Sequence, residues 1–226
     1  MPRVAKQAGM SAMARRMRRL RDADEFVPRL PVIYYVRHGL TDWNVQQRLQ
    51  GRHDVPLNVL GCAQAVRCGE ILQDLFVRDG RKPGDFDYVS SPLERARKTM
   101  DILRTTLGLE PAGYRIDDRL AEISFGAWEG LTYADVLARD GDVVARRESD
   151  KWGFQPPGGE SYAQVTARIG QWHATLDRDT VVAAHGGTAR ALIAHLALAP
   201  AQDATHRAID QGVVYVFAGS GLTRYA

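Results

Sequence analysis

The chain has 226 residues, 45% of them hydrophobic and 25% charged, which is the composition of an ordinary folded protein and excludes a disordered chain, a coiled coil or a collagen-like fibre. The net charge of +3 does not by itself indicate a nucleic-acid binder, and no apolar run of about 18 residues is present to span a membrane. The two cysteines argue against a disulfide framework and favour a cytoplasmic location.

Basic residues are concentrated at the N-terminus. Seven of the 30 precede the first acidic residue, Asp22, so the rest of the chain carries 23 basic and 27 acidic side chains. Residues 10–20 are rich in Met, Ala, Arg and Leu, which favour a helix. We predict a basic extension at 1–30 and one main domain at 31–226. For the extension, a loosely docked segment, a partner or lipid-surface contact and a transit-type signal stay open.

The predicted elements alternate between strands and helices. In chain order they are a strand at 32–36, a helix at 60–76, a strand at 86–89, helices at 93–107, 132–147 and 161–176, a strand at 180–184, a helix at 189–198 and a strand at 213–217. Asn58 is expected to cap the first helix and Gly108 to end the second, and residues 115–130 are predicted to be mostly loop. This alternation predicts an α/β fold: a three-layer sandwich with a mostly parallel central sheet and helices on both faces.

Polar and charged residues directly follow three of the predicted strands. An Arg-His-Gly triplet at 37–39 follows the first, residues 90–95 follow the second, and a His-Gly-Gly triplet at 185–187 follows the third. Ligands of an open α/β sheet bind beyond the carboxyl ends of its strands, so two histidines and two arginines are expected to meet there. The helices that come next add free N–H groups and a positive dipole, which is typical of an anion site.

This set of side chains suits phosphoryl transfer. Arginine binds phosphate oxygens through two parallel hydrogen bonds, and a histidine beside arginines is biased towards its neutral, nucleophilic form. His38 is then expected to attack phosphorus and to carry the phosphoryl group. The leaving alkoxide needs a proton, for which Glu122 and Glu129 are the candidate carboxyl groups.

These segments together resemble the histidine phosphatase superfamily, also called the phosphoglycerate mutase-like family. The resemblance covers residues 32–217, nearly everything except the extension, and it depends on short motifs in the family's order, at 36–44, 48–57, 61–65, 90–96, 122–130, 157–161 and 185–190. A single Arg-His-Gly triplet would be a weak signal, whereas the ordered set is specific. The stretch 123–130 resembles the phosphatase branch more than the mutase branch.

The resemblance implies roles for the matching residues. The implied catalytic residues are His38, Glu122 and His185, the implied phosphate ligands are Arg37, Asn44, Arg95 and Gly186, and the implied substrate-binding residues are Gln50 and Gly51. The family uses no metal or organic cofactor, so none is expected. Leu40 stands where many members carry Glu or Gln, and a polar contact at the edge of the pocket is therefore expected to be missing.

We accordingly expect a metal-independent phosphomonoesterase that hydrolyses a small phosphorylated metabolite through a phosphohistidine. No nucleic-acid partner is expected, and a homodimer stays open. One alternative is a phosphoglycerate mutase, although the chain is too short for the insertion that mutases tend to carry. The other is a non-catalytic module that binds a phosphate ligand, against which the intact set of residues argues.

Overall fold

Six strands form the central sheet. They are β1 (Ile33–Arg37), β2 (Asp87–Ser90), β3 (Arg115–Ile116), β4 (Thr180–Ala184), β5 (Val214–Ala218) and β6 (Gly221–Tyr225). Their order across the sheet is β3-β2-β4-β1-β5-β6. Among these strands only β5 runs against the others, because it pairs antiparallel with both β1 and β6 while the remaining pairs are parallel. The mostly parallel sheet is confirmed.

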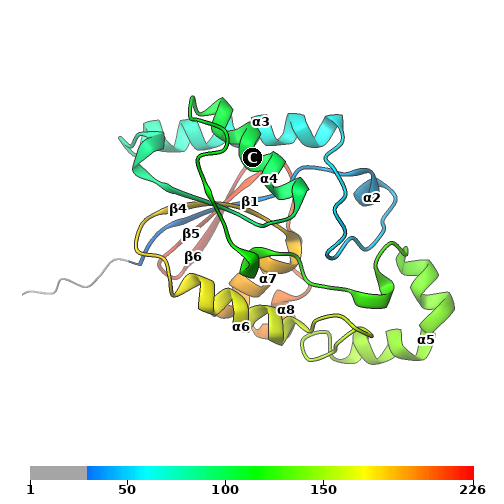
Figure 1. The fold of residues 1–226 in the computed structure, drawn as a ribbon. Coiled ribbons are helices and arrows are strands. Elements are labelled where there is room, and N and C mark those ends of the chain that lie inside the picture. Colours follow the sequence, from blue (N-terminus) through cyan, green and yellow to red (C-terminus); the bar gives the residue numbers. More distant parts are fainter. Residues whose placement is uncertain (1–29) are drawn as a thin grey trace, which may run out of the picture. The chain divides into compact units, whose positions relative to one another are not determined.

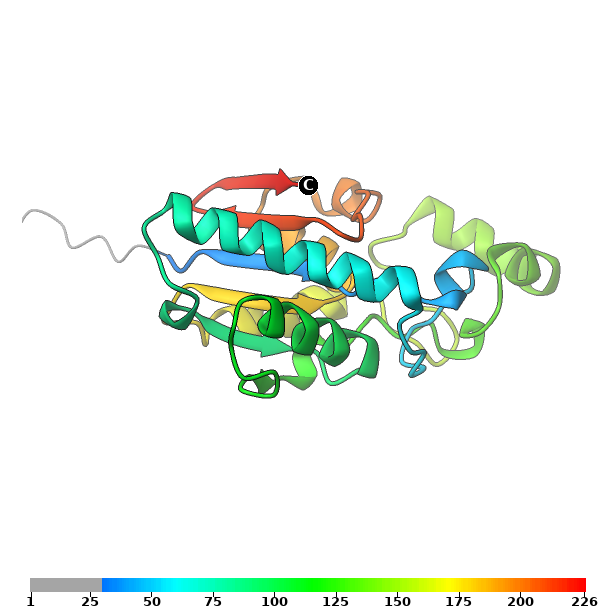
Figure 2. The ribbon, with the colours of Figure 1, turned by 90° about the horizontal axis from the view of Figure 1, so that it is seen from above.

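Helices cover both faces of this sheet. They are α2 (Asp42–Val45), α3 (Val59–Arg78), α4 (Glu94–Thr106), α5 (Tyr133–Ser149), α6 (Tyr162–His173), α7 (Gly186–His195) and α8 (Ala201–Ala204). Figure 1 shows α3 and α4 on one face and α6 and α7 on the other, which confirms the three layers. Figure 2 shows α2 and α5 beyond the carboxyl end of β1, so these two helices flank the edge where a ligand is expected.

The computed structural model describes residues 30–226. The predicted helix at 10–20 and the basic extension, apart from Leu30, lie outside the described residues. Residues 31–226 belong to one compact unit. None of the helices within the described part combines the length and the apolar character that a membrane crossing requires.

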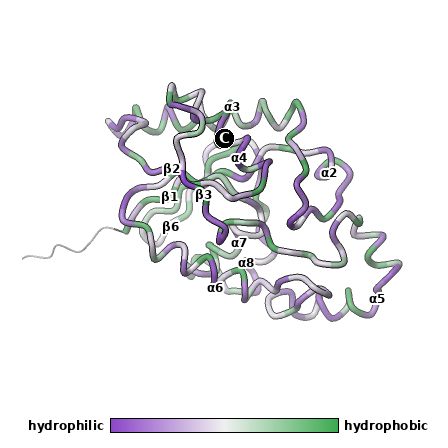
Figure 3. Tube along the Cα trace, in the orientation of Figure 1, coloured by the Kyte–Doolittle hydropathy of each residue, from purple (hydrophilic) through white to green (hydrophobic). Residues whose placement is uncertain are grey.

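The core lies on both sides of β1. Ile33 and Tyr35 pack into the cluster that α6 and α7 complete, whereas Tyr34 and Val36 pack into the cluster below α3 and α4. All four are buried, as expected for a central strand covered on both faces. Figure 3 shows hydrophobic and hydrophilic residues alternating along α3 and α5, the pattern of helices with one face towards a core.

Local sequence signals place several element ends as predicted. Asn58 caps α3, because its side chain accepts a hydrogen bond of 2.9 Å from the backbone N–H of Gly61. Gly108 follows α4 with a φ of +72°, a conformation that glycine adopts without strain. Both caps are therefore confirmed.

Other elements differ from the prediction. β3 forms within the segment predicted as loop, and it is only two residues long. α7 begins at Gly186 rather than at Ala189, because His185 is extended (φ −134°) and the side chain of Thr188 accepts a hydrogen bond from its backbone N–H. The consequence is that the first turn of α7 begins directly beside the end of β4.

Candidate active site

The carboxyl ends of two neighbouring strands, β1 and β4, bring the two predicted histidines together. β1 and β4 end in register, with Arg37 beside Ala184, and the backbone N–H of His38 donates to the carbonyl of Ala184 at 2.8 Å. His38 and His185 therefore leave the sheet side by side. Their ring centroids are 5.1 Å apart, at an interplanar angle of 57°.

The ring of His38 is held in one tautomer. Its Nδ1 lies 2.8 Å from the carbonyl oxygen of Gly39, and because a carbonyl oxygen only accepts, Nδ1 carries the hydrogen and Nε2 carries the lone pair. The side chain is buried. Burial, followed by the positive charges of Arg95 and Arg37, holds the pKa of His38 well below its usual range. The ring is thus neutral at neutral pH, with a basic nitrogen free to react.

His185 is fully buried and is held from several directions. Its Nε2 lies 2.6 Å from the hydroxyl of Ser91, and its backbone N–H donates to the hydroxyl of Tyr35 at 3.0 Å. Burial and the charges of Arg95 and His38 lower the pKa of His185 well below its usual range. His185 is therefore a second neutral ring, fixed by polar contacts from β1 and from the segment after β2.

Two arginines lie beside these rings. Arg95, in the first turn of α4, is completely buried, and its two terminal nitrogens donate to the carbonyls of His53 (2.6 Å) and Gly51 (2.8 Å). Arg37 donates from Nη1 to the carbonyl of Ile209 at 2.7 Å. Burial lowers the pKa of both guanidinium groups, and the negative charge of Glu122 raises it. Carbonyl groups bind both terminal nitrogens of Arg95 and one terminal nitrogen of Arg37, which fixes the orientation of each cation.

Buried polar atoms without a partner gather in this region. Within the described residues five such side-chain atoms occur, and four of them belong to residues that the sequence singled out: Arg37 Nε, Gln50 Oε1, Arg95 Nε and His185 Nδ1. Buried polar groups in folded proteins nearly always have a partner, so each exception needs an explanation. Because an arginine Nε is a donor only, two of these atoms call for an acceptor, which an anion supplies.

Glu122 lies against the beginning of α7. Its Oε2 accepts from the backbone N–H of Gly187 at 3.1 Å, and its Oε1 accepts from the N–H of Ile123 at 2.9 Å. A Cβ at position 187 would lie 2.3 Å from that Oε1, so glycine is required for this close approach. The helix N-terminus also favours a carboxylate at this position.

Gly186, the other glycine of the triplet, borders Arg37. A Cβ added to Gly186 would meet Arg37 Nε at 3.6 Å, an ordinary contact distance. The unpartnered Nε of Arg37 therefore faces the first turn of α7. This arrangement places an orphan donor and the N-terminus of a helix at the same point.

Asn44 has a structural role in addition to the one expected from sequence. It closes the capping box of α2, since its Oδ1 accepts from the backbone N–H of Thr41 at 3.2 Å. The same oxygen accepts from Nε2 of Gln211 at 3.1 Å, and Gln211 also donates to the carbonyl of His38 at 3.0 Å. Asn44 is thus connected to His38 through one side-chain amide.

The segment around Gln50 and Gly51 contacts Arg95 on one side and Glu129 on the other. Gln50 is buried, and Gly51 has a φ of +51° and would, with a Cβ, collide with Glu129 Oε1 at 2.0 Å. That oxygen accepts from the backbone N–H of Phe125 (3.0 Å) and from the hydroxyl of Ser124 (3.1 Å). Glu129 therefore positions the loop, and Glu122 is the better candidate for the acid.

Sequence reasoning missed several residues that hold the site together. Thr99 accepts from the backbone N–H of Gly39 at 3.1 Å and donates to the carbonyl of Arg95 at 2.8 Å. Thr99 and Gln211 are ordinary polar residues with no local signal. Ser91 belongs to the motif at 90–95, and its position after β2, parallel to β4, is the signal that points to a contact with His185.

Comparisons with known proteins agree with this geometry. The family profile of the histidine phosphatase superfamily (branch 1) matches residues 33–221. A glucosyl-3-phosphoglycerate phosphatase of Mycobacterium tuberculosis is 39% identical over 179 residues, which are 73% of this chain and 74% of the relative. The crystal structure of a mycobacterial glucosyl-3-phosphoglycerate phosphatase in complex with VO3 superposes with a TM-score of 0.68 at 35% identity, covering 83% of this chain and 92% of the other.

A mutase is also among the relatives. A 2,3-bisphosphoglycerate-dependent phosphoglycerate mutase of Xanthobacter autotrophicus is 29% identical over 194 residues, which are 82% of this chain and 90% of the mutase. The chain belongs to the histidine phosphatase superfamily. Within that superfamily it is a phosphatase, since the phosphatase relative is the more similar of the two.

Proposed function

We propose that the chain hydrolyses small phosphate monoesters through a covalent phosphohistidine on His38. The lone pair on Nε2 of His38 attacks phosphorus, and a P–N bond forms as the P–O bond to the leaving group breaks. Arg37 and Arg95 hold the phosphoryl oxygens. The Ser91 hydroxyl donates to Nε2 of His185, so that Nδ1 of His185 carries a hydrogen and binds a further oxygen.

Glu122 acts in both halves of the reaction in this proposal. As a carboxylic acid it gives its proton to the leaving alkoxide. As a carboxylate it then takes a proton from the water that attacks phosphorus. The P–N bond breaks, inorganic phosphate leaves, and His38 returns to its neutral form. The backbone N–H groups of Ile123 and Gly187 hold the carboxyl group in place for both steps.

One observation carries the proposal: the Nδ1 of His38 is fixed by the carbonyl of Gly39 in a buried, cation-flanked ring, which leaves Nε2 as the reactive atom. The substrate is proposed to be a phosphorylated metabolite of sugar-like character, in keeping with the name of the mycobacterial relative. Asn44 and Gly186 are proposed as further phosphate ligands, with Gln50 and Gly51 on the substrate side.

The remaining predictions from sequence stay predictions. No group of three or more His, Cys, Asp and Glu side chains within residues 30–226 is arranged to hold a metal ion. Turnover that persists in EDTA is the result expected of a metal-independent enzyme. The cytoplasmic location, the lack of a nucleic-acid partner and the oligomeric state await direct measurement.

The test traps the intermediate. The full chain is mixed with a phosphorus-labelled aryl phosphate, quenched in base and digested, and label is expected on the peptide that contains His38, stable in base and labile in acid. The variant His38→Asn is expected to lose both the label and turnover. His206→Asn is the matched control, because His206 is exposed, and it should keep both. Label on any other residue, or turnover by His38→Asn, contradicts the proposal.

The mutase alternative is tested with 3-phosphoglycerate. A phosphatase releases inorganic phosphate, whereas a mutase converts the 3-isomer into the 2-isomer without net release. The two outcomes differ only in whether water or a second hydroxyl takes the phosphoryl group from His38. We expect release of phosphate, because the phosphatase relative is 39% identical and the mutase relative 29%.

A further inference from the structure

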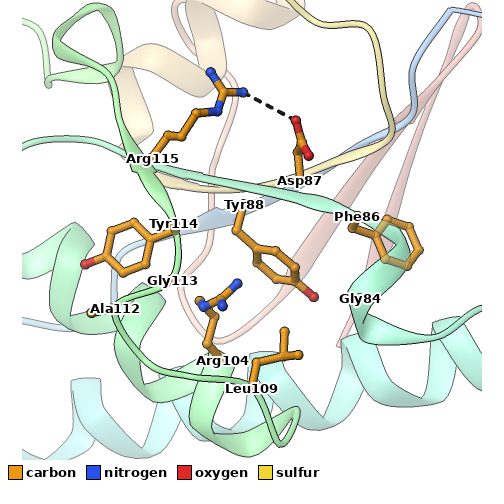
Figure 4. A pocket seen from close by; sticks show the side chains of 10 residues that line it. All are labelled: Gly84, Phe86, Asp87, Tyr88, Arg104, Leu109, Ala112, Gly113, Tyr114 and Arg115. Atoms are coloured by element: carbon orange, nitrogen blue, oxygen red, sulfur yellow. Dashed lines mark ion pairs between the residues drawn. The ribbon is translucent and has the colours of Figure 1, made fainter.

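A cavity lies away from the histidines, at the edge of the sheet formed by β2 and β3. Its volume is about 540 Å³, within the range of small-molecule sites. Figure 4 shows its lining, which comes from β2, α4 and the loop that leads to β3. Arg104 enters it near the end of α4, nine residues after Arg95, which corresponds to about 14 Å along the helix. The cavity is therefore separate from the proposed phosphoryl pocket.

Arg104 is a charged residue whose side chain is almost entirely buried beside the cavity. It is only 6% exposed, and its Nε donates to the carbonyl of Glu110 at 2.8 Å. Its guanidinium lies over the ring of Tyr88, 4.5 Å from the centroid. Within residues 30–226, neither of its terminal nitrogens donates a hydrogen bond or forms an ion pair. Because neither nitrogen is among the fully buried side-chain atoms without a partner, both are open to the cavity, where a ligand of opposite charge can accept from them.

The charges around the cavity do not compensate Arg104. The other charged residues of the lining are Asp87 and Arg115, and they pair with each other at 3.5 Å, as the dashed line in Figure 4 shows. Tyr88 donates to the carbonyl of Pro83 and is not an anion, since burial raises its pKa. The cavity therefore carries one uncompensated positive charge.

The remaining lining is apolar and aromatic. Phe86, Tyr88 and Leu109 border the cavity, and Figure 4 places the guanidinium of Arg104 between the rings of Tyr88 and Tyr114. The hydroxyl of Tyr114 is occupied by Asp101, to which it donates at 2.8 Å. A ligand in this cavity would thus place an apolar or aromatic body against these walls and one acceptor group on Arg104.

We propose that this cavity binds a small organic monocarboxylate whose carboxylate accepts two hydrogen bonds from the terminal nitrogens of Arg104. A carboxylate matches the planar, two-pronged geometry of a guanidinium, and its single negative charge balances the single free positive charge. A phosphate dianion would leave a net negative charge in a largely apolar lining. The proposed site is independent of the proposed phosphatase chemistry, because it shares no residue with it.

The experiment measures binding of benzoate to the full chain by calorimetry, with the probe raised to about 10 mM to detect weak association. We expect saturable binding of one molecule per chain. Benzamide, the neutral analogue of the same shape, is expected to bind at least about tenfold more weakly, because it has one acceptor oxygen instead of two and no negative charge to balance that of Arg104. Saturating vanadate fills the phosphoryl pocket and should leave benzoate binding unchanged.

Two variants test the role of Arg104. Arg104→Gln removes the charge and is expected to weaken benzoate binding at least about tenfold. Gly113→Ala keeps the charge but places a Cβ 2.6 Å from Nη2 of Arg104, which displaces the guanidinium, and a similar loss is expected. The matched control is Gly84→Ala, which also lies in the lining but whose Cβ would meet nothing within 4 Å, and it should bind benzoate like the wild type.

Several outcomes would overturn the proposal: no saturable binding of benzoate, equal binding of benzamide, displacement by vanadate, or undiminished binding by the Arg104 and Gly113 variants. Circular dichroism checks that each variant is folded. If Arg104→Gln does not fold, the comparison of Gly113→Ala with Gly84→Ala decides the question alone. Failure of the phosphohistidine proposal would leave these results unaffected, since none of them depends on turnover.

Discussion

His38 and His185 lie side by side, yet their ring nitrogens have different environments. The Nδ1 of His38 faces a carbonyl, which fixes the tautomer without ambiguity, whereas Nε2 of His185 faces the hydroxyl of Ser91, which either donates or accepts. A ring whose proton is fixed on one nitrogen is suited to nucleophilic attack by the other. When the hydroxyl of Ser91 donates to Nε2 of His185, as proposed, Nδ1 carries the hydrogen and can donate it to a phosphoryl oxygen. The roles proposed for the two histidines follow from this difference.

Glu122→Gln separates the acid role from a positioning role. Glutamine keeps the size of the side chain and one acceptor oxygen, enough for one of the two N–H groups of Ile123 and Gly187, but it cannot donate a proton to the leaving group as a carboxylic acid does. The kcat/KM of an alkyl phosphate, which reports formation of the phosphohistidine and not its hydrolysis, is therefore expected to fall about 100-fold or more, the usual contribution of a general acid. The kcat/KM of a nitrophenyl phosphate, whose leaving group needs no proton, should fall far less. Equal losses of kcat/KM for the two esters would remove Glu122 from the acid role.

At the scale of elements, the beginning of α7 is the least expected feature of the site. Glycine disfavours a helix, so the sequence predicted that α7 begins at Ala189, after the two glycines. In the structure the helix begins at Gly186, and glycine is needed at residue 187 because a side chain there would collide with Glu122. The two glycines thus lower the intrinsic stability of the helix. In return for no side chain, Gly187 lets a carboxyl group approach closely and Gly186 leaves open space beside Arg37.

Gly187→Ala tests this exchange. Alanine is the better helix former by about 1 kcal/mol, but its Cβ would lie 2.3 Å from Glu122 Oε1 and 2.7 Å from the side chain of Ile123. We expect the free energy of unfolding to change by no more than about 1 kcal/mol, while kcat for an alkyl phosphate falls at least about tenfold through displacement of Glu122. Gly141→Ala, a helical glycine of α5 with nothing near its Cβ, is the control and should keep full activity. Unchanged activity of Gly187→Ala would contradict the positioning role.

Sequence patterns predicted the elements that are buried and missed those that are not. The strand at 180–184 coincides with β4 because five consecutive buried apolar or β-branched residues leave no other assignment. β6 is almost wholly exposed and carries no such pattern, so only its pairing with β5 identifies it as a strand. The same reason applies to the site: the triplets at strand ends were visible, whereas Thr99 and Gln211 act through contacts that span 60 and 173 residues.

At the scale of the whole molecule, burying two neutral histidines makes stability depend on pH. The pKa values of His38 and His185 are both held well below the usual 6.5, mainly by burial. Below pH 6.5 the unfolded chain therefore binds protons that the native chain does not. The free energy of unfolding accordingly falls as the pH decreases from 6.5 towards the lowered native values, and it is unaffected by these groups above 6.5. His173, whose pKa is lowered by partial burial and by His195, adds a smaller contribution of the same sign.

The slope of the free energy of unfolding against pH measures how many protons the two histidine rings take up when the chain unfolds. Each contributes at most about 1.4 kcal/mol per pH unit, so a decrease of up to about 2.7 kcal/mol per unit is expected between pH 6.5 and 5. Carboxyl groups with lowered pKa values, such as Glu160, titrate below this window. The measurement is urea unfolding at several pH values, in buffer free of phosphate because a bound anion would add its own stability. For the double variant His38→Asn, His185→Gln, the free energy of unfolding should change much less with pH. The control His173→Gln should keep most of the slope. If the double variant kept the wild-type slope, the two rings would not be the neutral pair on which the nucleophilic role of His38 depends.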